Sequence, residues 1–97
     1  MKKTFKLTHP KIKPARLIEA VRRDVKKYLK REKRKSLPNC IDYWDFDCKF
    51  GPTEIKAEVI LASEISKCIS EAEAESLESF YLEILAKPGY KKILKKL

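Results

Sequence analysis

The sequence predicts a small α+β protein whose elements follow the order strand, helix, strand, strand, helix, strand. Three observations support this prediction. Apolar and polar side chains alternate strictly over residues 43–50, which is typical of a strand with one face on a core. Apolar residues between positions 17 and 29 recur at steps of three and four, which indicates an amphipathic helix. A chain of 97 residues with 43% hydrophobic content also suits one modest core.

The first strand is expected over residues 3–9, where Phe5 and Leu7 alternate with polar side chains and Pro10 ends the run. Pro14 suits the first position of a helix, because the N–H that proline lacks has no partner there. The apolar stripe of that helix ends at Leu29. Residues 30–35 offer no side chain to a core, so we expect them to project into solvent.

A hairpin is predicted next, with one strand over residues 43–50, a turn at 51–54 and a second alternating run over 55–61. A four-residue loop would place Asp47 opposite Glu58, whereas a two-residue loop would place it opposite Lys56. Both registers bury the same apolar face. The core-facing residues of the first strand are expected to be Trp44, Phe46, Cys48 and Phe50.

The second helix is expected to follow Ser63 as its N-cap, because apolar residues recur with helical spacing from 65 to 72. Its last turn carries glutamates, which is unfavourable for the helix dipole and predicts a cationic neighbour such as the first helix. The last strand is expected over residues 79–87, ending at Pro88.

With right-handed crossovers, this order of elements predicts a ferredoxin-like βαββαβ two-layer sandwich, a four-stranded antiparallel sheet with two helices on one face. The first and third strands would then be central, and the strand that contains Trp44 would lie at an edge. We expect one domain over residues 1–89 and a basic C-terminal tail over 90–97.

Composition excludes several classes of protein. The longest apolar run, residues 59–62, is too short to cross a membrane, and the amino-terminal residues lack an apolar signal core, so a cytoplasmic protein is expected. Three cysteines without Cys-x-x-Cys spacing indicate neither a disulfide framework nor a zinc site; Cys48 and Cys68 are expected in the core and Cys40 in a loop. No phosphate loop or nucleophile motif is present, and no cofactor is expected.

The net charge of +9 is distributed unevenly along the chain. Residues 1–35 carry a net charge of +12, residues 36–87 carry −7, and residues 88–97 carry +4. This asymmetry favours a polyanionic partner. The first helix is the main candidate, because lysine and arginine contacts to phosphates give salt-dependent affinity for RNA or DNA. The candidate residues are Arg22, Arg23, Lys26, Lys27, Lys30, Arg31, Lys33, Arg34 and Lys35. The alternative is a solvated face that keeps the protein soluble and matches the acidic second helix.

Two further sites are weaker hypotheses. An anion site at the start of the first helix would use Lys11, Lys13 and Arg16. A divalent metal site would use Asp45 and Asp47, roughly 7 Å apart on one strand face, together with Glu58. The single histidine, His9, has no catalytic partner spacing and is expected to have a structural or capping role.

The same order of elements occurs in RNA-recognition modules, which stack bases on aromatic residues of the two central strands. If the first and third strands are central, the open face of the sheet has no aromatic residue on them. Tyr43 and Tyr81 would lie on the outer strands. We therefore do not expect RNA to bind the sheet face in that way.

Three segments resemble a family of short bacterial proteins of unknown function: Phe5 to Pro10 (FKLTHP), Trp44 to Glu54 (WDFDCKFGPTE) and Glu78 to Gly89 (ESFYLEILAKPG). The resemblance covers nearly the whole chain and implies a bacterial, cytosolic, single-domain protein, but no activity or site. The residues themselves favour non-catalytic binding of nucleic acid or another polyanion. The alternatives are a module that binds an acidic protein or forms a homodimer, and a metal-dependent phosphodiesterase that uses Asp45 and Asp47.

Overall fold

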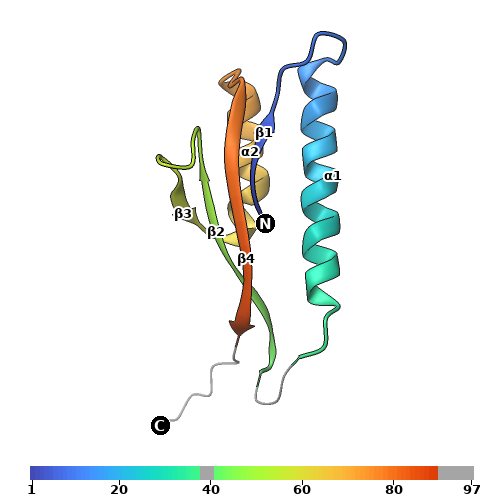
Figure 1. Cartoon of the computed structure of the whole chain (residues 1–97), viewed down its shortest axis with the longest axis vertical. Coiled ribbons are helices and arrows are strands. Elements are labelled where there is room, and N and C mark those ends of the chain that lie inside the picture. The colour runs from blue at the N-terminus through green and yellow to red at the C-terminus, as the bar shows by residue number, and fades with distance from the viewer. Residues whose placement is uncertain (38–40, 90–97) are drawn as a thin grey trace.

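The computed structural model describes residues 1–37 and 41–89. Its elements are β1 (Lys2–Lys6), α1 (Pro14–Lys33), β2 (Tyr43–Gly51), β3 (Glu58–Ile60), the 3₁₀ turn η1 (Ala62–Glu64), α2 (Ile65–Ala74) and β4 (Ser79–Gly89) (Figure 1). The α+β class, the two helices and the four-stranded antiparallel sheet are confirmed. The order of elements along the chain is compatible with a ferredoxin-like fold. The basic tail predicted over 90–97 lies outside the described residues.

The order of strands across the sheet is β1-β4-β2-β3. The prediction that the first and third strands are central, with the Trp44 strand at an edge, is therefore wrong: β4 and β2 are central. The physical reason lies in burial. β4 is 11 residues long, and its side chains Phe80, Leu82 and Ile84 are 0% exposed. β3 has only three residues, which is too short for a strand that must pair with a neighbour on each side.

Both helices cover the same face of the sheet, since their buried residues join one cluster with the inward side chains of three strands. In Figure 1, α2 lies behind β1 and β4, and α1 stands at the right and extends further than α2 toward the lower ends of β2 and β4. The cluster contains Phe5, Leu7, Ile18, Val21, Val25, Phe46, Cys48, Ile65, Ile69, Ala72, Phe80, Leu82 and Ile84. The other face of the sheet carries no helix in the described part of the chain.

The hairpin has neither of the predicted registers. Phe50 pairs with Glu58 and Cys48 with Ile60, so residues 51–57 connect the two strands. This register turns Ile60 toward the helices and leaves Val59, which pairs with Lys49, on the open face. The expected inward face of the second run is thus turned outward: Ile55, Val59 and Leu61 are 96%, 77% and 67% exposed.

Three element boundaries also differ from expectation. The second helix begins with η1, whose N-cap is Leu61 rather than Ser63, and the Leu61 N–H donates to Glu64 Oε1 at 2.8 Å. β4 continues through Pro88 to Gly89, where it pairs with β2. β1 ends at Lys6, although Leu7 remains buried. Pro14 is the first residue of α1, as predicted.

Candidate functional site

The candidate surface is the solvent side of α1. The helix is amphipathic because Ile18, Val21 and Val25 fall on one side and pack in the core, while the cationic residues occupy the rest of its circumference. The nine cations predicted to bind a polyanion are all present on α1 or within two residues of its end. Their contacts divide them into two groups.

Arg22 is held by the second helix. Its guanidinium donates to the hydroxyl of Ser66 at 2.7 Å and to the hydroxyl of Ser70 at 2.6 Å. In the described residues no ion pair joins α1 to α2, so the predicted matching of the basic helix to the glutamates of α2 is wrong. Neutral hydroxyl groups make this contact instead.

Glu32 holds two further cations. Its carboxylate lies 2.9 Å from Lys35 Nζ and 3.9 Å from Arg31 Nε. Glu32 is only 7% exposed, which contradicts the expectation that residues 30–35 offer nothing to the interior. Its position is explained by charge: a carboxylate can be buried here because two cations neutralise it.

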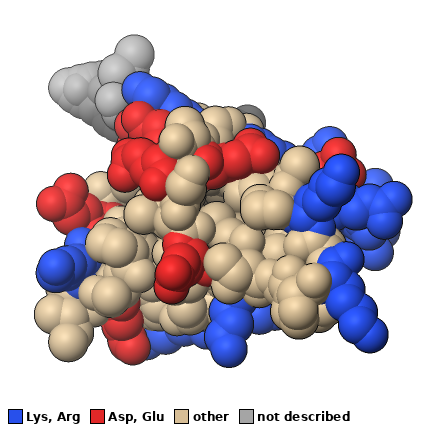
Figure 2. Space-filling model, turned by 90° about the horizontal axis from the view of Figure 1, so that it is seen from above, with Lys and Arg blue, Asp and Glu red and all other residues tan. Residues whose placement is uncertain are grey.

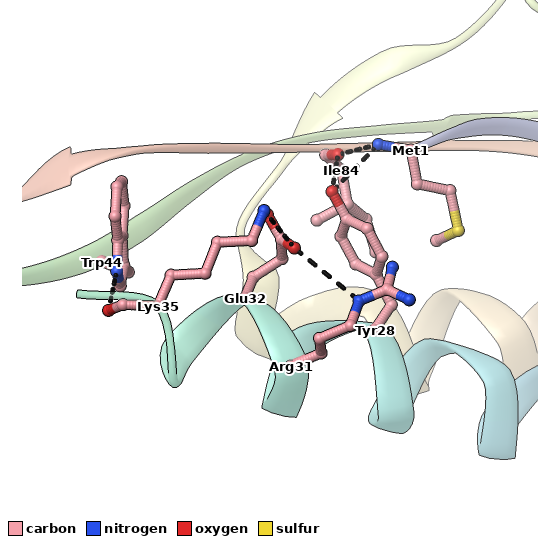
Figure 3. A network of polar contacts seen from close by, with 7 residues as sticks. All are labelled: Met1, Tyr28, Arg31, Glu32, Lys35, Trp44 and Ile84. Carbon is pink, nitrogen blue, oxygen red and sulfur yellow. Dashed lines mark hydrogen bonds and ion pairs between the residues drawn. The ribbon is translucent and has the colours of Figure 1, made fainter. Parts of the chain in front are cut away.

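The same end of α1 is fixed to the sheet (Figure 3). Trp44 Nε1 donates to the carbonyl of Lys35 at 2.9 Å, which satisfies a carbonyl that follows the helix. Tyr28 packs between helix and sheet, where its hydroxyl meets the Met1 amino group at 3.1 Å and the carbonyl of Ile84 at 3.4 Å. Burial raises the pKa of Tyr28. These contacts make the C-terminal half of α1 a fixed support for its exposed side chains.

The remaining six cations form an exposed group that we call the basic stripe. It consists of Arg23, Lys26, Lys27, Lys30, Lys33 and Arg34. No ion pair to these residues occurs in the part of the chain that the structure describes. From Arg23 to Arg34 the helical rise gives a length of roughly 16 Å. Figure 2 shows Lys and Arg gathered on the side of α1 and most of the Asp and Glu toward the opposite side.

The weaker anion hypothesis concerned Lys11, Lys13 and Arg16. All three are exposed, and the ordered contacts among them are made by the backbone: the Arg16 N–H donates to the Lys13 carbonyl at 3.0 Å. His9 Nδ1 accepts a hydrogen bond from the Lys11 N–H at 3.0 Å, a structural contact in the loop before α1 and not a helix cap. Among the described residues, no side-chain contact draws Lys11, Lys13 and Arg16 toward a common point.

The structure does not bring the predicted metal ligands together. Asp45 and Asp47 lie on the open face, whereas Glu58 pairs with Phe50 and therefore points to the helix side. Asp47 Oδ1 instead accepts from Lys87 Nζ at 2.6 Å, a contact that raises the pKa of Lys87. In the described residues no group of three His, Cys, Asp or Glu side chains is placed to hold a metal ion.

The revised strand order changes the argument about the open sheet face. Tyr43 and Tyr81 lie on the central strands β2 and β4, not on outer strands as predicted. Tyr81 is nevertheless only 4% exposed, and its hydroxyl donates to Glu83 at 2.8 Å. Burial and this hydrogen bond raise the pKa of Tyr81 to about 12. A buried ring cannot stack on a base, so the sheet face lacks the pair of exposed central aromatics.

Two of the cysteines lie in described regions. Cys48 is 1% exposed, which confirms its core position, while Cys68 is only half-buried. Burial raises the pKa of both thiols, that of Cys48 to about 11, with the Asp47 carboxylate as a second cause. A raised pKa opposes formation of the nucleophilic thiolate. Cys40 lies outside the described residues.

The fold and this surface define a small α+β domain that presents a cationic helix. The chain belongs to the family of unknown function DUF6172, whose match covers residues 1–95. This confirms the resemblance to a family of unknown function; the bacterial origin that it implied stays a prediction. No curated protein and no solved structure matches the chain. Within residues 1–37 and 41–89, neither helix is long and apolar enough to cross a membrane.

Proposed function

We propose that this protein is a non-catalytic, cytoplasmic binding protein for nucleic acid or another polyanion, and that the basic stripe of α1 makes the contact. The observation that carries the proposal is the stripe itself: six exposed cations on α1 and its C-cap residue, none of which forms an ion pair within residues 1–37 and 41–89. A nucleic-acid strand carries a phosphate about every 3.4 Å of rise. A stripe of roughly 16 Å therefore matches about five phosphates.

The contacts at both edges of the stripe support this role. Arg22 joins α1 to the second helix, and the carbonyl of Lys35 accepts a hydrogen bond from Trp44 of the sheet. The side chains of Arg31 and Lys35 pair with Glu32 at the end of the same helix, so the six other cations face solvent from a fixed backbone. The helix loses little conformational entropy on binding, because its backbone is already ordered by packing. Only the side chains must be immobilised. We expect no preference for sequence, since the contacts would be made to phosphates.

Fluorescence anisotropy with short labelled single- and double-stranded RNA and DNA, titrated with salt, tests the proposal. The test variant replaces Lys27, Lys30 and Arg34 by Gln. Its matched control replaces Lys11, Lys13 and Arg16 by Gln, which removes the same charge elsewhere. For single strands the logarithm of affinity falls with the logarithm of salt by about 0.7 per phosphate contact.

The stripe variant should therefore lose about 2 from that slope and bind more weakly, while the control should keep the wild-type slope. Equal losses in the two variants would show that binding follows net charge and not the stripe. Binding that disappears at physiological salt in the wild-type protein would also contradict the proposal.

A second candidate function is self-association through the edge strand β3, favoured by the exposure of Ile55, Val59 and Leu61. Exposed apolar edge strands are templates for pairing with another chain. Antiparallel pairing of two copies about Val59 would set Val59 against the partner's Val59, and Ala57 against the partner's Leu61. The apolar side chains on the open face would thus meet each other.

Analytical ultracentrifugation tests this second function. Wild-type protein should form a dimer at high concentration, and Val59→Lys should remain a monomer. Thr4→Lys, which adds the same charge on the edge strand β1 at the opposite side of the sheet, should still dimerise. A wild-type protein that stays monomeric at all concentrations would exclude the arrangement.

A further inference from the structure

A pocket of about 500 Å³ lies between the middle of α1 and the start of the second helix. Its apolar wall is aliphatic and is formed by Val25, Leu29, Ile65 and Ile69 together with Ala62. This volume is within the range of about 300–1,000 Å³ that is usual for small-molecule sites. The pocket is therefore large enough to take several carbon atoms of a ligand.

The polar part of the pocket is cationic. Arg22, Arg23 and Lys26 line one side, Ser63 and Ser66 line the other, and no Asp or Glu is among the lining residues. A pocket of this kind, with an aliphatic wall and converging cations, matches a ligand that has an apolar body and a negatively charged end.

Arg22 is the best-placed of these cations. Its guanidinium is fixed by the hydroxyls of Ser66 and Ser70, which are neutral, so its charge is oriented but not neutralised by these bonds. A guanidinium has five N–H donors, and its planar fork suits the two oxygens of a carboxylate or phosphate. The two serine contacts thus pre-organise a cation in the lining of an aliphatic pocket.

We propose that this pocket binds a small amphiphilic anion, an aliphatic chain that ends in a carboxylate or a phosphate. The chain lies against the aliphatic wall, and the anionic end is bound by Arg22 and Lys26 with a hydroxyl of Ser63 or Ser66. This site shares Arg23 and Lys26 with the basic stripe but differs from the proposed contact with nucleic acid in the rest of its lining. Among the described residues that line the pocket there is no aromatic ring on which a base could stack. Four cations of the stripe do not line it: Lys27, Lys30, Lys33 and Arg34.

The backbone at the start of the second helix is not needed for this site. The Glu64 carboxylate already accepts the Leu61 N–H in a capping arrangement, so a negative charge is present at that terminus. The positive charge that recognises the anion therefore comes from the side chains of α1. This makes substitution of Lys26, which has no contact with the second helix in the described residues, a direct test.

Isothermal titration calorimetry with octanoate and octyl phosphate, each below its micelle-forming concentration, tests the proposal. Octanol lacks the charge, and acetate and inorganic phosphate lack the chain. We expect saturable binding of one octyl anion per chain and none of the three controls at the same concentrations. Hexanoate should bind more weakly than octanoate, by about fourfold for each buried methylene that is lost. The headgroup that binds more tightly identifies which of the two anions the site prefers.

Three variants and one control locate the ligand. Lys26→Met and Arg22→Met keep the alkyl stem and remove the charge, and each should weaken binding of the tighter octyl anion by about tenfold or more. Ser63→Leu fills the pocket from an exposed position and should abolish binding. Lys27→Met removes the same charge from the adjacent position, outside the pocket, and should bind as the wild type does.

Several results would overturn the inference: no binding of either octyl anion, equal binding of octanol, or equal losses in Lys26→Met and Lys27→Met. Ser63→Leu separates this inference from the proposed function, because it leaves every cation of the stripe in place. That variant should bind RNA and DNA as the wild type does. Nucleic-acid affinity lost in Ser63→Leu together with the octyl anion would mean that the two ligands share one site.

Discussion

Gly51→Ala should destabilise the protein through a clash with backbone. A Cβ added at Gly51 would lie 2.6 Å from the Ala57 Cα and 2.8 Å from the Lys56 carbonyl oxygen, where residues 51–57 fold back over the sheet. Overpacking of this kind costs about 1–3 kcal/mol. Gly51 has no positive φ, so alanine also returns about 0.4–1 kcal/mol by restricting the unfolded chain.

The net loss should therefore be about 1–2 kcal/mol in the free energy of unfolding, which for a domain of this size lowers Tm by about 5–15 °C. Urea unfolding followed by the fluorescence of Trp44, the single tryptophan, measures it. Gly89→Ala is the matched control, because its Cβ would meet the ring of Tyr43 and no backbone atom is among its nearest contacts. Tyr43 is 43% exposed, and a side chain can yield more easily than backbone, so the change should cost less than Gly51→Ala does. Equal losses in the two variants, or a Gly51→Ala protein as stable as the wild type, would refute this reasoning.

Three further predictions concern titration, thiol reactivity and the end of α1. Because the pKa of Tyr81 is raised from 10.0 to about 12, the folded state holds the phenol proton more tightly than the unfolded state does. The free energy of unfolding should therefore fall as pH rises from 10 toward 12. In Tyr81→Phe, the urea concentration at the unfolding midpoint should depend less on pH over that range. Cys68 should react with a maleimide in the native protein, whereas Cys48 should react only on unfolding, as mass spectrometry of labelled peptides would show. Trp44→Phe should cost about 1 kcal/mol, because it removes the hydrogen bond to the Lys35 carbonyl and keeps most of the ring.

The element types could be predicted from the sequence because helix and strand periodicity are local properties of the chain. The order of strands across the sheet could not be obtained from the order of elements along the chain. Either the third or the fourth strand can lie between the first and the second. One signal for β4 was nonetheless present. Its sequence has apolar side chains on both faces, with Tyr81 and Leu85 opposite the core residues, which is typical of a central strand. The third strand has three residues and includes the charged Glu58, which is typical of an edge.

The alternation of residues 55–61 predicted a strand that pairs with β2, as observed, but the predicted register was wrong. A period of two shows that apolar side chains share one face, but the register decides which face that is. Here the backbone of residues 56 and 57 packs against Gly51, so the connection is longer than a tight turn and the parity of pairing changes. The two segments can approach this closely because Gly51 has no side chain. A hydrophobic pattern in the sequence does not predict such a backbone contact. The outcome is the exposed group of Ile55, Val59 and Leu61 on which the self-association hypothesis depends.

The candidate site shows the same division between local and long-range information. Charge counts and spacing were sufficient to select α1 and its nine cations, because both are read along one helix. The sequence could not predict that Arg22 is held by another element, because its serine partners lie 44 and 48 residues away along the chain. This distinction determines which experiment is informative: removing Arg22 also removes a contact between helices, so its loss of binding alone cannot separate recognition from packing. Lys26 makes no such contact in the described residues, belongs to the stripe and lines the pocket. A comparison of Lys26 with its exposed neighbour Lys27 therefore tests recognition with the fold held constant.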